Sequence, residues 1–330
     1  MTWRTPIHRP IPRRHPGAAL LLVLASLALL AFVVTEIIAA ATTRLIWEAQ
    51  RTQRHTLRRE AFSALEATLG VLGAFAQIDG ALFGPAQGWE NPLEVARFEP
   101  GGGIKIDVEL RDESGLYGLQ ALAENTVVAR RFFQDLGIDE TQAQTLADCL
   151  ADWTDADEAV RANGAERDRY GDGIAPPNRP VQTLDELRLI HGFAETFFTE
   201  NGTGNALWER FSKSVSLLGT SATPNINTAP EPVLEVLASR HSFDPQTVIA
   251  ARNGSNNISG ATTVFRNAGD LGRASLPPAL GSVVSFTCSQ LRVIVRASKG
   301  DASVVVDSLL NNANGRVGVR NQRVNALLSE

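Results

Sequence analysis

Cysteine is almost absent from this chain, which has only Cys149 and Cys288 among its 330 residues. So few cysteines, so far apart in the sequence, exclude a disulfide framework and a CxxC zinc site. One long-range disulfide bond is compatible with the sequence. Two separately buried thiols are the simpler expectation, because a free cysteine behaves as a small hydrophobic residue.

Catalytic motifs are also missing. The sequence contains no G-x-S-x-G element, no P-loop and no H-E-x-x-H pair. His191 and His241 fall in expected helices without the spacing of a metal site, and acidic clusters alone do not make a general acid and base. We therefore expect a protein that is not an enzyme, with no catalytic residues and no organic cofactor.

Basic residues are outnumbered by acidic residues, 31 to 36, which gives a formal net charge of −5. The first 17 residues carry four arginines and no acid, so the rest of the chain holds 27 basic and 36 acidic residues. Binding to nucleic acid draws mainly on Lys and Arg at phosphates. The charge therefore argues against a nucleic-acid partner, while 44% apolar and 20% charged residues are typical of a globular chain.

A long uncharged run occupies the N-terminal region. Residues 15–35 carry no formal charge, and at about 1.5 Å per helical residue such a run just crosses a hydrocarbon core of roughly 30 Å. A secretory signal would end at a small-x-small cleavage site with a change of composition. Here no proline interrupts residues 17–84, and apolar residues recur at helical spacing: Phe62, Leu65, Leu69, Leu72 and Phe75. We predict one continuous helix, first transmembrane and then amphipathic, whose orientation the flanking arginines leave open.

The remaining chain carries strand signals at both ends and helix signals between them. Residues 104–110 alternate as a strand with one buried face, and strands return at 285–298, 301–310 and 315–324. The segments 122–153, 183–198 and 227–240 have helical patterns, with Asp139 and Gln142 placed as a capping box and Asn227 or Thr228 as the last cap. This order predicts an α+β fold interrupted by a helical insertion of roughly 150 residues.

We therefore divide the chain into five parts. They are a basic leader at 1–17, the transmembrane part of the N-terminal helix at 18–40, the rest of that helix with the first strands at 41–120, an inserted α-helical domain at 121–275, and C-terminal strands at 276–330.

An acidic loop follows the helix that ends near Trp153. Its carboxylates lie among Gly, Asn and Pro residues: Asp152, Asp155, Asp157, Glu158, Glu166, Asp168 and Asp172. Hard cations such as Ca²⁺ take six to eight oxygen ligands from such a mixture of carboxylates and loop carbonyls. The EF-hand spacing is missing, so the pattern alone predicts a solvated acidic loop, with a calcium site as the alternative.

Several stretches resemble one family. The basic leader that ends in glycine before an apolar helix resembles the signal of type IV pilins and pseudopilins, which a prepilin peptidase would cut between Gly17 and Ala18. Most such proteins have a glutamate five residues into the mature chain, where this chain has Leu22. WTDADEAVRANGAERDRY, PPNRPVQTLDELRLIHG and NINTAPEPVLEVLA then follow in the order typical of the K-type minor pseudopilin of type II secretion, general secretion pathway protein K, which also lacks that glutamate.

The resemblance implies a pseudopilin fold whose inserted domain is SAM-like or helix-hairpin-helix-like. It implies a single pass through the bacterial inner membrane, a globular part in the periplasm, and a place at the pseudopilus tip that promotes protein export. The implied partners are I- and J-type minor pseudopilins, other pseudopilins, the inner-membrane assembly platform, prepilin peptidase and the lipid bilayer. The implied cofactor is calcium, with Asp155, Asp157, Glu166 and Asp168 as first ligand candidates and Asp152 and Asp172 behind them.

Two alternatives stay open at this point. One is a minor pilin of a type IV pilus or competence system. The other is a membrane-anchored helix-hairpin-helix protein that binds DNA through the segments at 183–198 and 227–240. Against the second, those loops lack the paired glycines that let backbone approach phosphate, and the acidic balance opposes it.

Overall fold

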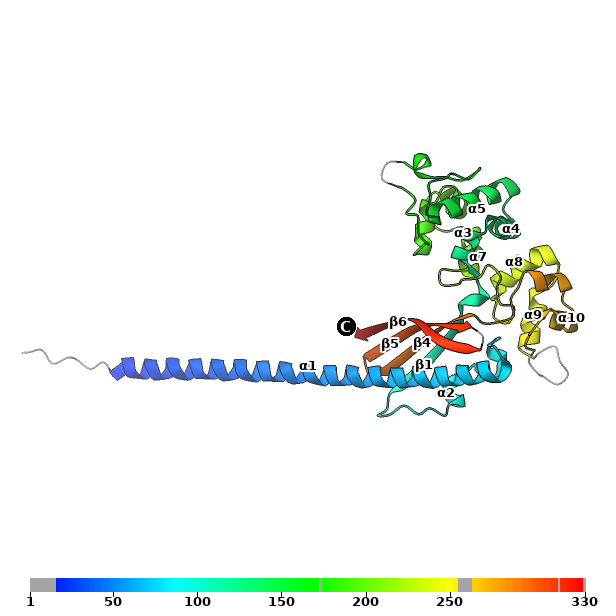
Figure 1. The fold of residues 1–330 in the computed structure, drawn as a ribbon. Helices are drawn as coiled ribbons and strands as arrows, with labels where there is room; N and C mark the ends of the chain where they lie inside the picture. The colour runs from blue at the N-terminus through cyan, green and yellow to red at the C-terminus, as the bar shows by residue number, and fades with distance from the viewer. Residues whose placement is uncertain (1–15, 172–173, 255–262, 314, 329–330) are drawn as a thin grey trace, which may run out of the picture. The chain divides into compact units, whose positions relative to one another are not determined.

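A computed structural model describes residues 16–171, 174–254, 263–313 and 315–328 (Figure 1). The chain divides into two compact units, Met1–Thr56 and Leu57–Glu330. The boundary falls inside the first helix, α1 (Pro16–Asp79). Each unit is described by itself below.

The described part of the first unit is the N-terminal portion of α1. α1 is one uninterrupted helix of 64 residues, which confirms the continuous helix expected from the sequence. Its large apolar side chains between Leu20 and Trp47 are exposed, and the helix is apolar and long enough to cross a membrane by length and composition. Gly17 and Ala18 lie at its start, while residues 1–15 of the expected leader are outside the described residues.

The second unit begins with the amphipathic end of α1, which packs on an antiparallel sheet. The sheet has the strand order β1-β4-β5-β6, and its strands run beside the cyan part of α1 in Figure 1. The strands are β1 (Lys105–Asp112), β4 (Gln290–Lys299), β5 (Ala302–Ala313) and β6 (Arg316–Leu328). The expected strand segments are thus confirmed.

Alternation along the strands builds the core between sheet and helix. Val108 lies opposite Val295, which in turn lies opposite Val306, so one face of the sheet is apolar. Leu65 and Leu72 of α1 are buried against this face in the same cluster. At about 25 cal/mol per Å² of apolar area, this burial is the main force that holds α1 on the sheet.

A helical region lies between β1 and β4. It contains α3 (Leu119–Glu124), α4 (Thr126–Asp135), α5 (Glu140–Thr154), α6 (Phe193–Phe197), α7 (Ala206–Ser214), α8 (Glu231–His241), α9 (Pro245–Arg252) and α10 (Ala268–Arg273). The same region contains short elements: the 3₁₀ turns η2 (Glu113–Gly115), η3 (Arg167–Arg169), η4 (Leu184–Leu189) and η5 (Pro278–Ser282), and the strands β2 (Tyr117–Gly118) and β3 (Val215–Ser216). Two further short elements, η1 (Pro85–Gln87) and α2 (Pro92–Val95), lie between α1 and β1.

Aromatic rings fill the centre of this region. Phe133 stacks on Phe211 with ring centroids 6.1 Å apart, and Phe211 lies 4.9 Å from Phe197. These rings belong to a cluster of buried residues separate from the one beneath α1. Cys149 belongs to the cluster of the helical region and Cys288 to the cluster beneath α1, and both are free, buried thiols.

Local details differ from the sequence expectations in two places. The segment at 183–198 is a 3₁₀ turn followed by a five-residue helix, because Gly192 adopts a positive φ of 84° between them. The helix expected from 227 begins at Glu231 after Pro230, and neither Asn227 nor Thr228 caps it, because both side chains form bonds elsewhere. The start of α5 agrees better, since Asp139 accepts hydrogen bonds from the backbone N–H groups of Thr141 and Gln142.

Candidate functional site

Two acidic residues at the C-terminal end of α5 bind the same arginine of the loop that follows. Asp152 is fully buried in the last turn of α5, and Asp155 caps its C-terminus. Arg161 Nη1 donates to Asp152 Oδ1 and to Asp155 Oδ2, each over 2.5 Å, and the Arg161 backbone N–H donates to Asp152 Oδ2 over 3.2 Å. Burial disfavours the charged guanidinium, but the bonds to Asp155 and Asp152 outweigh it and raise the pKa of Arg161.

Glu166 is the third acidic residue. Glu166 is only 4% exposed, and its Oε1 is buried without a hydrogen-bond partner. Burial raises the pKa of Glu166 to about 7, and the negative charges of Asp152 and Asp155, then of Glu158 and Asp157, act in the same direction. Asp155 Oδ1 is likewise buried without a partner. Arg161 pairs with Asp152 and Asp155 only, so Glu166 lies beside their charges without an ion-pair partner of its own among the described residues.

The other candidate residues are placed differently. Asp157 is exposed, and its Oδ1 accepts a hydrogen bond from the Ala159 backbone N–H over 2.8 Å. Asp168 is exposed in η3, and Asp172 lies outside the described residues. Within the described part of the chain, no group of three or more His, Cys, Asp or Glu side chains has the geometry of a metal site.

The three segments quoted above for their family resemblance, at 153–170, 176–192 and 225–238, are called signature segments here, and the first two hold each other in place. Trp153 Nε1 donates to Glu186 Oε1 over 3.0 Å, and Arg179 Nη1 donates to the same oxygen over 3.1 Å. The Trp153 ring packs on Tyr170, with centroids 5.5 Å apart. Gly164 closes the loop on α5, since a Cβ at this position would lie 1.9 Å from Asp152 Oδ2.

The third signature segment, which contains Asn225, forms its hydrogen bonds elsewhere in the fold, at the end of β1. Asn225 is fully buried, and its Nδ2 donates to the Phe83 carbonyl over 2.7 Å and to Asp112 Oδ2 over 2.9 Å. Asp112 Oδ2 also accepts from Thr228 Oγ1 over 2.5 Å, and its Oδ1 accepts from Ser114. Burial raises the pKa of Asp112, and these hydrogen bonds oppose the rise. This network was missed from the sequence, where the only signal was a polar Asn-x-Asn-Thr run before a helix.

The fold and the loop define a class of protein. A long helix that is apolar at one end and packed on a four-stranded antiparallel sheet at the other is a pilin-like body, here with a large helical region between β1 and β4.

Comparisons with known proteins find similarity to one particular family. The pattern of the family described as "Type II secretion system (T2SS), protein K" matches residues 109–200, which contain the first two signature segments. Type II secretion system protein K of Pseudomonas aeruginosa is 27% identical over 71% of this chain and 68% of the relative. The proteins of the same name from Aeromonas hydrophila and Pectobacterium carotovorum are 25% and 31% identical, over 57% and 54% of this chain and 62% and 58% of those relatives.

A solved structure shows the same fold. A chain of the GspK-GspI-GspJ complex from the type 2 secretion system of enterotoxigenic Escherichia coli superposes with a TM-score of 0.57 at 18% identity, over 84% of this chain and 98% of that chain. The sequence matches and the fold together show that this chain is similar to K-type minor pseudopilins of type II secretion.

Proposed function

We propose that this chain is a K-type minor pseudopilin that is anchored in the bacterial inner membrane by the N-terminal part of α1 and caps the tip of the periplasmic pseudopilus, where it promotes export across the outer membrane. The observation that carries the proposal is α1 itself: an exposed apolar helix continues without a break into a helix packed on a sheet. Such a helix can lie in the bilayer and later pack against the helices of other subunits. No catalytic role is part of the proposal.

The proposed partners are I- and J-type minor pseudopilins. Support comes from the structural relative, which was solved as a GspK-GspI-GspJ complex. Leu22 would occupy the fifth position of the mature chain, where an intramembrane carboxylate is costly unless it is paired. A tip subunit, with no subunit above it, has no need of that carboxylate.

Co-purification tests the partner proposal. The full chain, co-expressed with I- and J-type pseudopilins and extracted in detergent, should purify as a stoichiometric complex. A type IV minor pilin expressed in place of the I-type protein is the matched control and should not be retained. Purification of the chain alone, under conditions in which the I- and J-type proteins are folded, would contradict the proposal.

Processing is tested separately. Prepilin peptidase should remove about 17 residues, so mass spectrometry of the protein from cells with the peptidase should show an N-terminus at Ala18. Gly17→Asp should block the cut and leave the full mass. An intact Met1 in the unsubstituted protein from such cells would refute this part of the proposal.

Calcium binding by the acidic loop is also part of the proposal. The donor chemistry fits, because Glu166 Oε1 and Asp155 Oδ1 are buried oxygens without partners in a cluster of carboxylates. Asp152, Asp155 and Glu166 would hold the ion, with Asp157, Asp168 and Asp172 as further ligands from the loop. A bound Ca²⁺ would offset the charges of these carboxylates and stabilise the loop. Arg161, which now bridges Asp152 and Asp155, would have to release at least one carboxylate.

A thermal shift measurement tests calcium binding. Millimolar Ca²⁺ should raise the melting temperature of the full chain in detergent relative to the same sample in chelator, because a ligand of the folded state stabilises it. Asp155→Ala combined with Asp157→Ala should abolish the shift, while Asp185→Ala, an exposed residue outside the loop, should leave it unchanged. An unchanged melting curve in Ca²⁺ would remove the ion from the proposal.

A further inference from the structure

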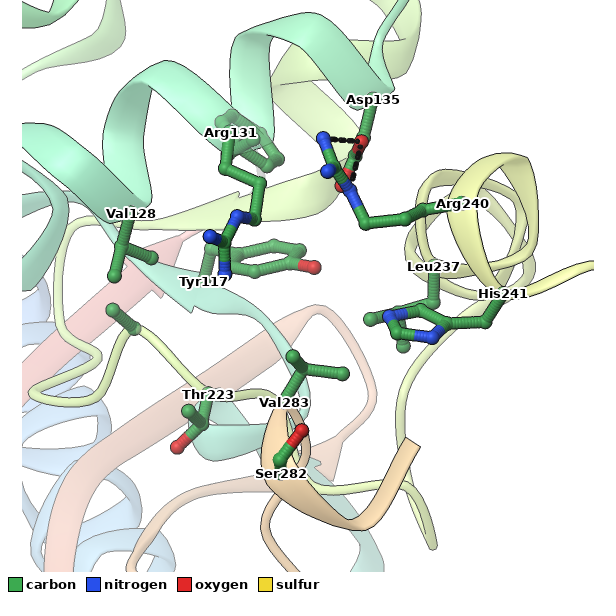
Figure 2. A pocket seen from close by; sticks show the side chains of 12 residues that line it. Tyr117, Val128, Arg131, Asp135, Thr223, Leu237, Arg240, His241, Ser282 and Val283 are labelled. Carbon is green, nitrogen blue, oxygen red and sulfur yellow. Dashed lines mark hydrogen bonds and ion pairs between the residues drawn. The ribbon is translucent and has the colours of Figure 1, made fainter. Parts of the chain in front are cut away.

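A cavity of about 110 Å³ lies within the helical region and is not part of the acidic loop. Its walls come from β2, α4, the segment before α8, α8 and η5 (Figure 2). The inner wall is apolar and includes Tyr117, Phe132, Leu237 and Val283. A cavity of about 150 Å³ can enclose benzene, so this smaller one encloses an apolar group of about four carbon atoms, or a six-membered ring only in part.

Basic groups line one side of the same cavity. Arg240 forms an ion pair with Asp135, with Nη2 and Oδ1 2.6 Å apart, and Figure 2 shows the two side chains joined at the cavity edge. Arg131 also lines the cavity and has no ion-pair partner among the residues that the structure describes. Burial lowers the pKa of His241; the charge of Asp135 acts to raise this pKa, and the charges of Arg240 and Arg131 act to lower it. The lining therefore carries one positive charge that is not compensated.

The Tyr117 hydroxyl supplies a second polar group. Tyr117 is 6% exposed, and within the described part of the chain its hydroxyl makes no hydrogen bond but keeps some contact with solvent, since it is not one of the buried polar atoms that lack a partner. In Figure 2 this hydroxyl points toward the side of the cavity where Leu237 and His241 lie. A ligand oxygen in the cavity would take the place of water as the hydrogen-bond partner of this hydroxyl.

We propose that this cavity binds a carboxylate attached to a small apolar group. The apolar group would occupy the space beside Phe132, Leu237 and Val283, and the carboxylate would accept hydrogen bonds from the Arg131 guanidinium and the Tyr117 hydroxyl. A carboxylate fits better than a neutral polar group because it offsets the free charge of Arg131, and charge-assisted hydrogen bonds are the stronger kind. Such a ligand is either a free organic acid or the C-terminal residue of a protein.

Tyrosine is a convenient reporter, because Tyr117 and Tyr170 are the only two tyrosines in the chain. The full chain in detergent, labelled with 3-fluorotyrosine, should give two ¹⁹F signals, which Tyr170→Phe assigns. Titration with benzoate should shift the Tyr117 signal with saturation at a Kd on the order of 1 mM. The Tyr170 signal, which lies in the acidic loop, should not move. Benzyl alcohol, which has the same ring without the charge, should bind at least about tenfold more weakly.

Arg131→Gln should weaken benzoate binding about tenfold, the effect of losing one charge-assisted hydrogen bond. Arg131→Lys, which keeps the charge, should weaken it less. Lys213→Gln removes the same charge from an exposed site on α7 and is the matched control, with binding expected to stay as in the unsubstituted protein. Because Arg131 is exposed, all three variants should keep the ¹⁹F spectrum of the folded protein.

The outcomes separate clearly. No shift of the Tyr117 signal at 10 mM benzoate, equal binding of benzyl alcohol, or unchanged binding in Arg131→Gln would each overturn the proposal. To distinguish the two sources, a short peptide that ends in leucine is compared with its C-terminal amide. Binding of benzoate together with the free-acid peptide supports a protein C-terminus, and binding of benzoate without the peptide supports a free organic acid.

Discussion

Glu186 shows how a single carboxylate can join two distant parts of the chain. It accepts hydrogen bonds from Trp153 Nε1, from Arg179 Nη1 and, over 3.0 Å, from the Gln182 backbone N–H. Burial alone would raise its pKa, but the bonds from Gln182, Trp153 and Arg179 are stronger in sum and lower the pKa of Glu186. The carboxylate is therefore ionised at neutral pH and ties α5 to η4.

The residue-scale prediction replaces Glu186 by glutamine. Glu186→Gln should lower the free energy of unfolding at pH 7 by about 1 to 3 kcal/mol, because the buried Trp153 Nε1–H and the more exposed donors of Arg179 and Gln182 lose an ionised acceptor. A lowered folded-state pKa gives stability that is present above the ordinary glutamate pKa and is lost as pH falls through the lowered value. The difference between variant and parent should therefore shrink below about pH 4, as urea unfolding in chelator would measure.

Asp185→Asn is the matched control for that experiment. Asp185 is the neighbouring residue, its side chain is 86% exposed, and its ion pair with Arg188 spans 3.7 Å. Exposed pairs contribute little, so the expected change is below about 0.5 kcal/mol at either pH. An equal loss in both variants would show that Glu186 has no special role.

The acidic loop was only partly predictable at the level of residues. The sequence placed Asp152, Asp155 and Glu166 in one candidate set; the structure joins Asp152 and Asp155 through Arg161, and their charges act to raise the pKa of Glu166. The structure leaves Asp157 and Asp168 exposed. The role of Arg161 could not be predicted. The loop contains both acidic and basic residues, and their order in the sequence does not show which carboxylates Arg161 contacts after folding.

At the scale of elements, long periodic segments were the most predictable. The stripe along α1 and the alternation of β1, β4, β5 and β6 follow from burial on one face, which the sequence records directly. The parallel pair β2 and β3 has two residues in each strand, too few for any periodicity. The start of α8 was misplaced for a different reason: Asn227 and Thr228 form tertiary hydrogen bonds to Phe265 and Asp112 instead of capping the helix.

The element-scale prediction concerns the attachment of α1 to the sheet. Leu72 is fully buried against the sheet, and Leu72→Ala should cost about 2 to 5 kcal/mol because it leaves a cavity. Ile78, one and a half turns further along the same helix, is 81% exposed. Ile78→Ala should therefore change the free energy of unfolding by less than about 0.5 kcal/mol. Thermal unfolding of the full chain in detergent, followed by circular dichroism, would compare them, and similar losses would contradict this packing of α1.

At the scale of the whole folded unit, the notable feature is that two hydrophobic clusters share one polar junction. One cluster lies beneath α1 and the other fills the helical region. Asp112 ends β1 and receives a hydrogen bond from Asn225, 113 residues later in the chain. Pairings over such separations leave no periodic signal, so the sequence predicted an insertion but not the residues that join it to the sheet. The boundaries assigned from the sequence, at 120 and 275, stay predictions.

The junction leads to a prediction about cooperativity. Asn225→Ala would leave the Phe83 carbonyl and Asp112 Oδ2 each short of a buried hydrogen bond, at a cost of about 1 to 3 kcal/mol for each group. Because the junction lies between two separate clusters, its loss should also allow the two clusters to unfold independently. Calorimetry of the full chain should then show a lower midpoint of unfolding and a van't Hoff enthalpy below the calorimetric enthalpy, which indicates two transitions.

Asn321→Ala, at an exposed position on β6, is the control and should leave the midpoint and the ratio of the two enthalpies unchanged. If Asn225→Ala keeps the ratio of the two enthalpies found for the unsubstituted chain, the clusters are coupled by other contacts, and the junction does not make the sheet and the helical region unfold together.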